Sequence, residues 1–433
     1  MTERQRSGVV AGTDIVDVAG VGFGPSNLAV AAAIAEFASE VPVTARFFEA
    51  QPRFGWHRGM LIEGATMQVS HLKDLVTMRN PTSPYSFLCY LQAKGRLADF
   101  INTKSFYPLR VEFHDYLEWV AESFADLVSY GSRVVAVEPV TGEQGVEFLD
   151  VVFVAADGTR QVQRARSLVI AAGSEPRLPA ELPSSARVWH TSRFLPEVER
   201  IAQQDPRSFV VLGSGQSAAE AIDHLHTRFP QARVHSVHAR YGFSVADDSP
   251  FANQVFNPDA VDRFYTAPDD VRQRLIDYHA GTNYSVVDAD LLQSLFRQAY
   301  LERVAGNPRL NFHNVSRIRE VTETPDGLRI DVESLSSNTS TIIEAEALVC
   351  ATGYNRIDPA VFLDGLLPHC ALDNQGRLRL DREHRVVTDE SVRCGVYVQG
   401  FSEHSHGLSE TLLSLSAVRA GEIGDMLVKA LSG

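Results

Sequence analysis

Hydrophobic and polar positions along the chain predict two copies of one structural unit, far apart in the sequence. In the first, an apolar strand at residues 14–20 leads into a glycine-rich turn and an alanine-rich helical run, and a second apolar strand ends at Glu49. In the other, an apolar run at residues 209–212 meets a glycine turn and a helical pattern, followed by a strand at residues 233–239. Strand, tight turn, helix and strand in this order are typical of a parallel sheet covered by helices.

Two more apolar strands end in glycine turns, at residues 165–179 and 346–359. Together the four segments predict an α/β fold with two Rossmann-like dinucleotide-binding domains, one inserted in the other. We expect residues 1–190 and 330–433 to form the first domain and residues 191–329 to form the inserted one.

Composition narrows the class of protein. The chain has 433 residues, of which 44% are hydrophobic and 22% charged, as in globular proteins rather than disordered or coiled-coil chains. The formal net charge of −14 argues against a nucleic-acid partner. No apolar stretch is long enough to span a bilayer or to serve as a secretion signal, so we expect a cytoplasmic protein. The four cysteines form no CxxC pair, which predicts neither a zinc site nor a redox dithiol.

The first glycine turn is a candidate FAD site. Gly20, Gly22 and Gly24 lie where a strand meets a helix, and helix N-termini bind the pyrophosphate of dinucleotides. The last position of the GxGxxG pattern is Pro25, so the fingerprint is imperfect. Glu49 ends the following strand, where an acidic side chain holds ribose hydroxyls, although it comes 29 residues after Gly20 rather than about 20. The alternative is an ordinary packing turn.

The second glycine turn is the candidate NADPH site. It comprises Gly213, Ser214, Gly215, Gln216 and Ser217, followed by an alanine that the pattern allows. Alone it could equally be a packing turn, but two such turns in one chain favour a flavin in the first unit and a nicotinamide cofactor in the second. The acceptor of the flavin's electrons stays open on these patterns alone. A disulfide reductase is disfavoured because no paired cysteines exist, whereas an electron-transfer partner or O₂ would leave no local pattern.

Longer motifs resemble those of a known family. They occur in one order along nearly the whole chain: GVGFGPSNLAVA, MQVSHLKDLVTMRNPTSPYSFLCYL, FHDYLEW, GSGQSAAE, ADDSPFANQVFNP, TNYSVVD, ATGY and HGLSETLLS. Together they resemble the microbial N-hydroxylating flavin monooxygenases, and among these the L-ornithine Nδ-hydroxylases of hydroxamate siderophore biosynthesis. Baeyer–Villiger and related monooxygenases carry FxGxxxH, whereas this chain has Ser184 and Ala186 before His190. The resemblance implies FAD, NADPH, O₂ and a cytoplasmic homotetramer.

The resemblance also implies roles for individual residues. Lys73 and Asn253 would bind the substrate's α-carboxylate, while Asn283 would lie where substrate and nicotinamide ribose meet. Ser409, which we expect at the start of a helix, would touch the substrate. The residues implied to contact FAD outside the glycine turn are Trp56, His57, Gln68, Val134 and the backbone of His406, Gly407 and Leu408. Without the resemblance, Lys73 would pass for a surface lysine and Ser409 for a helix cap.

Other assignments remain open in the sequence. The 2′-phosphate of NADPH requires a cation after the second strand, and Arg240 is placed there, although the family arginine aligns with Ala239. His404 and His406 have no third ligand nearby, so we expect no metal site. No general base for the substrate amine is evident, and the catalytic base stays unassigned.

The substrate prediction is L-ornithine. A carboxylate-binding lysine argues against the diamines putrescine and cadaverine, and an L-lysine Nε-hydroxylase differs by one methylene in its substrate. The alternative from another class is a non-catalytic flavin- and NADPH-binding redox sensor.

Overall fold

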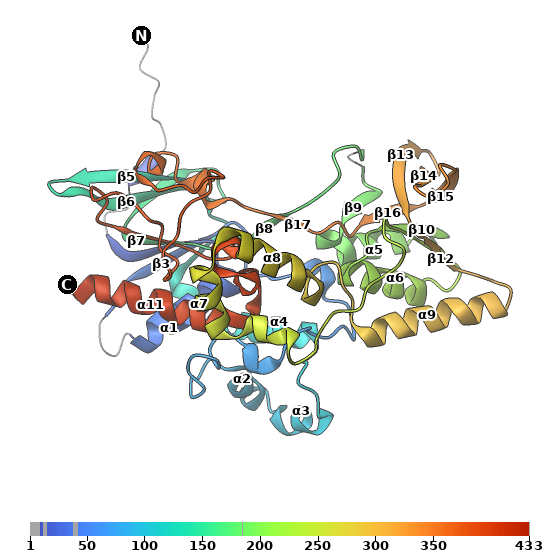
Figure 1. Ribbon diagram of the computed structural model, residues 1–433, viewed down its shortest axis with the longest axis horizontal. Coiled ribbons are helices and arrows are strands. Elements are labelled where there is room, and N and C mark those ends of the chain that lie inside the picture. Colours follow the sequence, from blue (N-terminus) through green and yellow to red (C-terminus); the bar gives the residue numbers. More distant parts are fainter. Residues whose placement is uncertain (1–8, 12–14, 38–41, 184, 433) are drawn as a thin grey trace, which may run out of the picture.

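The first body of the protein is built on an eight-stranded sheet (Figure 1). The computed structural model describes residues 9–11, 15–37, 42–183 and 185–432. The main path of the sheet has the order β4-β3-β2-β7-β6-β5, and both β1 and β18 pair with β7. Its strands are β1 (Val9–Ala11), β2 (Val16–Val21), β3 (Ala45–Glu49), β4 (Val128–Tyr130), β5 (Arg133–Gly142), β6 (Gly145–Val154), β7 (Arg160–Ile170) and β18 (Gly395–Val398). β2 pairs in parallel with β3 and β7, whereas β5, β6 and β7 form an antiparallel meander.

Helices cover this sheet. α1 (Pro25–Phe37) is buried from Asn27 to Ile34, and its small side chains let α11 (Ser416–Ser432) pack closely along it. Below them in Figure 1 lie α2 (Phe87–Ala93) and α3 (Leu97–Thr103), and α4 (Arg110–Glu122) packs against both α1 and α2. A large apolar cluster that includes aromatic side chains of α2 and α4 joins these helices to α1. The N-terminus of α1 is thereby held rigidly at the end of β2.

The second body contains a five-stranded parallel sheet of order β12-β11-β10-β16-β9. Helices α5 (Phe194–Ala202), α6 (Gln216–Arg228) and α9 (Ala289–Val304) contact it, as does the antiparallel meander β13-β14-β15. The strands are β9 (Val188–His190), β10 (Ser208–Leu212), β11 (Arg233–Val237), β12 (Leu310–His313), β13 (Ser316–Thr324), β14 (Gly327–Ser334), β15 (Ser340–Ala345) and β16 (Ala347–Cys350). The predicted boundaries at 190/191 and 329/330 therefore fall inside this body's sheets.

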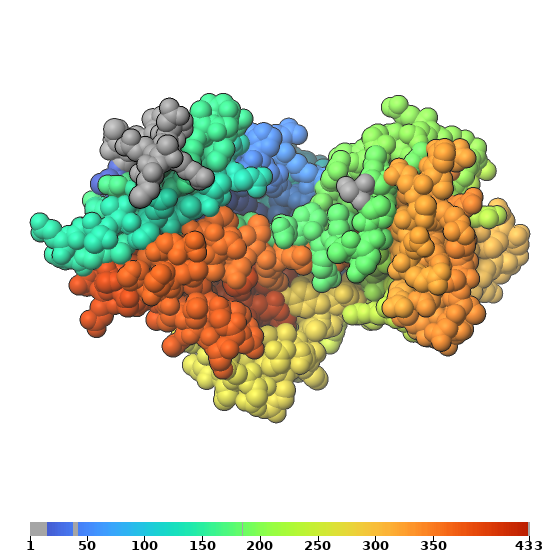
Figure 2. All heavy atoms as spheres, turned by 90° about the horizontal axis from the view of Figure 1, so that it is seen from above, coloured from blue at the N-terminus to red at the C-terminus, as the bar shows by residue number. Residues whose placement is uncertain are grey.

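The two bodies lie side by side and exchange elements (Figure 2). Helices α7 (Pro258–Thr266) and α8 (Asp269–His279) belong to the inserted segment, yet both pack on α10 (Glu403–His406), which follows β18 of the first body. Two short strands, β8 (Ser174–Pro176) and β17 (Tyr354–Arg356), pair where the chain passes between the bodies. The inserted segment thus reaches back over the first body.

The predicted α/β fold with two dinucleotide-binding units is confirmed, whereas the helix expected to begin at Ser409 is wrong. Residues Leu408–Thr411 and Leu413–Leu415 form the short 3-10 helices η9 and η10, and α11 begins only at Ser416. Leu412 between them has extended backbone angles, which interrupt the helix. Among the described residues, no helix combines the length and apolar character that crossing a membrane requires. Ser184, used above to separate two families, lies outside the described residues.

Candidate functional site

The first glycine turn forms an open cradle at the N-terminus of α1. Gly22 has φ +80°, and a Cβ there would lie 2.5 Å from the carbonyl oxygen of Ala171, so only glycine fits. A Cβ on Gly24 would meet nothing within 4 Å, which leaves space in front of the free N–H groups of the helix. Gly20 differs, because its Cβ would lie 2.1 Å from the Phe47 ring. Gly20 is therefore a packing glycine, and the cradle is formed by Gly22, Gly24 and the helix start at Pro25.

Glu49 lies beside this cradle at the end of β3. Its Oε2 accepts a hydrogen bond from the backbone N of Phe23 at 2.8 Å, and its Oε1 accepts one from Gln51 N at 2.8 Å. A carboxylate has about four acceptor positions, so two remain for ligand hydroxyls. Asn27 completes the turn, since its Nδ2 donates to the Gly22 carbonyl at 2.7 Å. An N–H-rich helix end next to a carboxylate fits the pyrophosphate and ribose of a dinucleotide.

The second glycine turn repeats this design. Gly213 has φ +138°, and a Cβ there would lie 2.4 Å from the carbonyl oxygen of Ala351 at the end of β16. Gly215 caps α6, and its Cβ position is 3.4 Å from Cα of Ser285. Arg240, just after β11, donates from Nη1 to the Ser285 carbonyl at 3.0 Å. Ser285 thus contacts both Arg240 and Gly215, the N-cap residue of α6.

The other residues expected to contact FAD lie on several elements of the first body. Trp56 and His57 meet edge to face with ring centroids 4.5 Å apart, and His57 has the left-handed backbone angle φ 50°. Val134 is buried in β5, next to a shift in the β5–β6 register. Gln68 is exposed, and its Nε2 donates to Asp288 Oδ1 of the second body at 3.2 Å.

Lys73 lies near the element that carries Asn253, although 180 residues separate the two in the chain. Lys73 ends the 3-10 helix η2 (His71–Lys73), and its Nζ lies 5.8 Å from the ring centroid of Phe256. Phe256 belongs to the same 3-10 helix, η5 (Ala252–Phe256), as Asn253. Burial lowers the pKa of Lys73, and no carboxylate of the described residues forms an ion pair with it. A half-buried ammonium without an acidic partner is suited to an anionic ligand.

Ser409 and Asn283 border the same region. η5 contacts η9, which contains the buried Ser409, and η2 contacts η10. Asn283 follows the 3-10 helix η6 (Ala280–Thr282), and the hydroxyl of the next residue, Tyr284, donates to Glu403 Oε2 at 2.7 Å. Contacts among η2, η5, η9 and η10 therefore bring the segments of Lys73, Asn253 and Ser409 together, and the Tyr284–Glu403 hydrogen bond links the segment of Asn283 to α10.

The side chain of His406 forms its hydrogen bonds with other residues and not with its own backbone. His406 Nε2 donates to the carbonyl oxygens of Asp381 and Arg382 at 3.1 and 3.3 Å, while the Ser405 hydroxyl donates to Nδ1 at 2.8 Å. Burial, together with the neighbouring His384, lowers the pKa of His406 to about 3, so the ring is neutral. Gly407 then turns the chain with φ +88° before the buried Leu408.

Comparison with known proteins agrees with this geometry. Residues 14–356 match the family model described as L-lysine 6-monooxygenase/L-ornithine 5-monooxygenase. The chain belongs to this family. It is 39% identical to the L-ornithine N(5)-monooxygenase of Pseudomonas aeruginosa over 96% of this chain and 94% of the relative.

Two solved structures extend the comparison. The Kutzneria sp. 744 ornithine N-hydroxylase, in a complex with reduced FAD, NADP⁺ and L-ornithine, is 43% identical with a TM-score of 0.92, covering 96% of this chain and 99% of that one. The L-lysine 6-monooxygenase of Pseudomonas syringae is 35% identical with a TM-score of 0.83, covering 96% and 100%. The resemblance to N-hydroxylating monooxygenases that the motifs indicated is thereby confirmed.

Several buried groups of this family member were missed by sequence reasoning. Arg419 donates from Nη1 to Glu410 Oε1 at 3.2 Å and from Nε to Gln399 Oε1 at 3.1 Å. Gln399 in turn donates to Asn27 Oδ1 at 3.2 Å. This chain of contacts joins η9, where Ser409 lies, to the first glycine turn. Its members are far apart in the sequence, so no local pattern indicated it.

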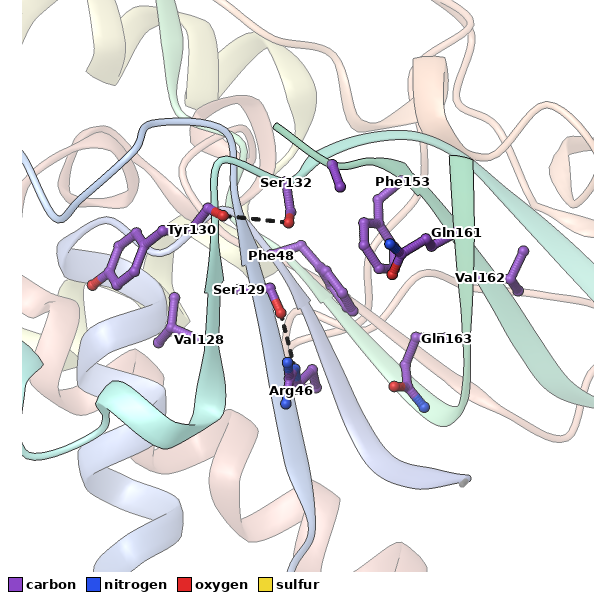
Figure 3. Close-up of a pocket in the computed structure, with 11 residues that line it drawn as sticks. Arg46, Phe48, Val128, Ser129, Tyr130, Ser132, Phe153, Gln161, Val162 and Gln163 are labelled. Atoms are coloured by element: carbon purple, nitrogen blue, oxygen red, sulfur yellow. Dashed lines mark hydrogen bonds between the residues drawn. The ribbon is translucent and has the colours of Figure 1, made fainter. Parts of the chain in front are cut away.

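A separate pocket of about 460 Å³ lies on the first sheet (Figure 3). Its lining includes Arg46, Phe48 and Phe153, and Arg46 Nε donates to the Ser129 hydroxyl at 3.0 Å. None of the residues expected to bind FAD, NADPH or substrate lines it. The described residues contain no group of three or more His, Cys, Asp or Glu side chains arranged to hold a metal ion, around His404 and His406 or elsewhere.

Proposed function

We propose that this protein uses FAD, NADPH and O₂ to hydroxylate the side-chain amine of L-ornithine, giving Nδ-hydroxyornithine for a hydroxamate siderophore or a related natural product. The observation that carries the proposal is Lys73, a half-buried ammonium with no acidic partner among the described residues, next to the segments of Asn253 and Ser409. The named activities of the ornithine-hydroxylating relatives support it.

The two glycine turns would hold the cofactors. FAD fits the cradle of Gly22, Gly24 and Glu49, and NADPH fits the turn at Gly213 and Gly215, with Arg240 as the cation for the 2′-phosphate. When bound, the flavin supplies the redox chemistry, in which a hydride from NADPH provides the electrons that activate O₂. The chain's own residues bind and orient the substrate and the cofactors, and they exclude water from the site.

Substrate binding follows from charge. Lys73 and Asn253 hold the α-carboxylate, which directs the far amine toward Asn283 and Ser409. An alkyl ammonium has a pKa of about 10.4 and no free electron pair, so the site must favour the neutral amine. No protein group among the described residues is assigned as its proton acceptor.

Specificity for ornithine over lysine depends on the length of the substrate site. Lysine is longer by one methylene, a difference of about 1–3 kcal/mol in a pocket, and a lysine-hydroxylating relative is 35% identical. Ornithine is favoured over lysine by the higher identity to the ornithine enzyme. Diamines lack the carboxylate that Lys73 would bind.

Three further proposals concern the whole chain. Strand pairing favours an inserted NADPH-binding unit of about residues 188–352, with the rest forming the FAD-binding unit. We also propose a homotetramer and a cytoplasmic location; the four unpaired cysteines are compatible with a reducing compartment. Light scattering of the holoenzyme would give four times the 47.7 kDa chain mass for a tetramer.

One assay tests the activity. The purified holoenzyme is incubated with NADPH, O₂ and either L-ornithine, L-lysine or putrescine, and the hydroxylamine product is measured. We expect product with ornithine and little with the other two. Product with lysine alone would identify the lysine-hydroxylating alternative, and bound flavin without product from any amine would favour a redox sensor.

A further inference from the structure

A hydrogen-bonded cluster joins the two bodies beside the second glycine turn. Asp288 caps α9, and its Oδ2 accepts from Gln216 Nε2 at 2.8 Å while its backbone N donates to Gln216 Oε1 at 2.9 Å. Its other oxygen, Oδ1, accepts from Gln68 Nε2 at 3.2 Å. One carboxylate oxygen of Asp288 therefore binds Gln216, the first residue of α6 in the second body. The other oxygen binds Gln68 of the first body.

A buried ion pair reinforces the same contact. Glu220 lies one turn after Gln216 on α6 and accepts both guanidinium Nη groups of Arg110, at 2.7 and 2.6 Å. The two side chains are only 11% and 6% exposed. Gln216 Nε2 also donates to Glu220 Oε1 at 2.9 Å, so the ion pair and the Asp288 contact form one network. Bidentate pairs of this kind fix orientation as well as distance.

Arg110 carries the network into the first body. Besides Glu220, its guanidinium donates to the carbonyl oxygens of Met60 and Thr66, at 3.0 and 3.3 Å. These carbonyls belong to the irregular segment 60–68, which ends at Gln68 and leads directly to η2 and Lys73. Met60 and Ile62 of this segment pack in the apolar core of the second body, and Met67 N donates to the Pro108 carbonyl of the first body at 2.8 Å. The Arg110 contacts therefore add to a segment that already touches both bodies.

We propose that Arg110, Glu220 and Asp288 form an interdomain brace that fixes the second glycine turn relative to segment 60–73. They are positioning residues: through Gln216 and Gln68 they set the distance between the nicotinamide cofactor and the flavin. This role rests on the proposed function, since it assumes that the two turns hold these two cofactors. The geometry of the brace itself does not depend on the substrate.

The composition of the brace explains why each member matters. Glu220 is paired with the Arg110 guanidinium, whereas Asp288 accepts from the amides of Gln216 and Gln68, and burial raises the pKa of Asp288. Exchanging either acid for its amide preserves shape but replaces charged acceptors with weaker ones. The bodies would then be held less firmly, while each body's own core would be unaffected.

Two variants and one control test the brace. Glu220→Gln breaks the ion pair, and Asp288→Asn is the milder change that retains every heavy-atom position. Glu199→Gln removes the ion pair with Arg228 of α6, which is exposed, and serves as the control. Hydrogen–deuterium exchange of the holoenzymes is measured over residues 60–68 and 283–289, and flavin reduction by saturating NADPH is followed without O₂.

We expect both variants to exchange faster in the two segments and to reduce flavin about tenfold or more slowly, because a misplacement near 1 Å costs about 100-fold in such reactions. Flavin content should match wild type, as should both readouts of the control. Wild-type exchange in both variants would overturn the brace. Faster exchange with an unchanged reduction rate would overturn its positioning role. If wild type fails to hydroxylate any amine, the exchange result still decides whether the brace exists.

Discussion

At the scale of single residues, Glu410 shows how a buried charge is held in place. It is 2% exposed, and its carboxylate accepts from Arg419 and from the Ser402 hydroxyl. Burial alone raises the pKa of a carboxyl, but the Arg419 guanidinium and the nearby His384 outweigh it and lower the pKa of Glu410 to about 2. The ionised form is therefore favoured by folding, and the loop that carries Ser409 depends on it.

The lowered pKa of Glu410 in the folded protein predicts that the free energy of unfolding depends on pH. Because the folded-state pKa is below the unfolded value of 4.5, the stabilisation is complete above about pH 5 and is lost as the pH falls toward 2. Glu410→Gln leaves Arg419 buried and unpaired, so we expect the free energy of unfolding to fall by about 3–5 kcal/mol at pH 7. The difference from wild type should shrink by about 1 kcal/mol at pH 4. Urea unfolding at both pH values measures it.

A matched control separates burial from charge. Glu333 pairs with Arg317, whose side chain is 62% exposed, so Glu333→Gln should change the unfolding free energy by less than about 1 kcal/mol. A Glu410→Gln difference that stays the same at pH 7 and pH 4 would show that this carboxyl titrates normally.

Lys73 supports a second prediction at this scale. Loss of a hydrogen bond to a charged group costs about 1.5–3 kcal/mol, so Lys73→Ala should raise the KM for ornithine about 10- to 150-fold. NADPH oxidation should continue, because the second glycine turn lies elsewhere. Lys94→Ala is the control, since Lys94 forms an exposed ion pair with Asp115. An unchanged KM in the Lys73 variant would remove the carboxylate contact.

At the scale of elements, the first glycine turn contains two glycines that are needed for different reasons. Gly22 is required by its own backbone, whereas the Cβ position of Gly24 is empty. Gly24→Ala should therefore fold with wild-type thermal stability in the flavin-free state, yet bind little FAD because its methyl group occupies the pyrophosphate position. Flavin absorbance per chain and Tm measure the two effects.

The corresponding control is Gly242→Ala, where a Cβ also meets nothing within 4 Å but lies after β11. It should retain its flavin. If Gly24→Ala were isolated fully yellow, the phosphates would have to bind elsewhere along α1.

Local patterns account for what the sequence could predict about these elements. The strands next to the glycine turns, the turns themselves and Glu49 follow from apolar runs and glycine spacing within some 30 residues. The prediction of a helix starting at Ser409 is wrong because Leu412 adopts an extended conformation, which its residue type does not indicate. The partners of Asp288 and Arg110 could not be predicted, since their contacts span 72 to 220 residues and depend on how the two bodies meet.

At the scale of the whole molecule, the proposed substrate region draws on three distant parts of the chain. Lys73 comes from the first body, Asn253 from the inserted segment and Ser409 from the return to the first body. Neither body alone contains the complete set. Binding of ornithine should therefore depend on the relative placement of the bodies, which no local sequence pattern encodes.

This assembly predicts that Lys73 and Asn253 act as a unit. If both side chains hold one carboxylate, removing the first leaves the second badly oriented, so the double variant Lys73→Ala/Asn253→Ala should raise the KM for ornithine less than the product of the single effects. Coupled residues in contact differ from additivity by about 0.5–3 kcal/mol, which is at least about twofold in KM. Kinetics of the four proteins complete the cycle, and Lys94→Ala combined with Asn253→Ala should show no such coupling. Purely multiplicative effects would mean that the two residues bind different parts of the substrate, and that the inserted segment serves the amine end or the cofactor instead.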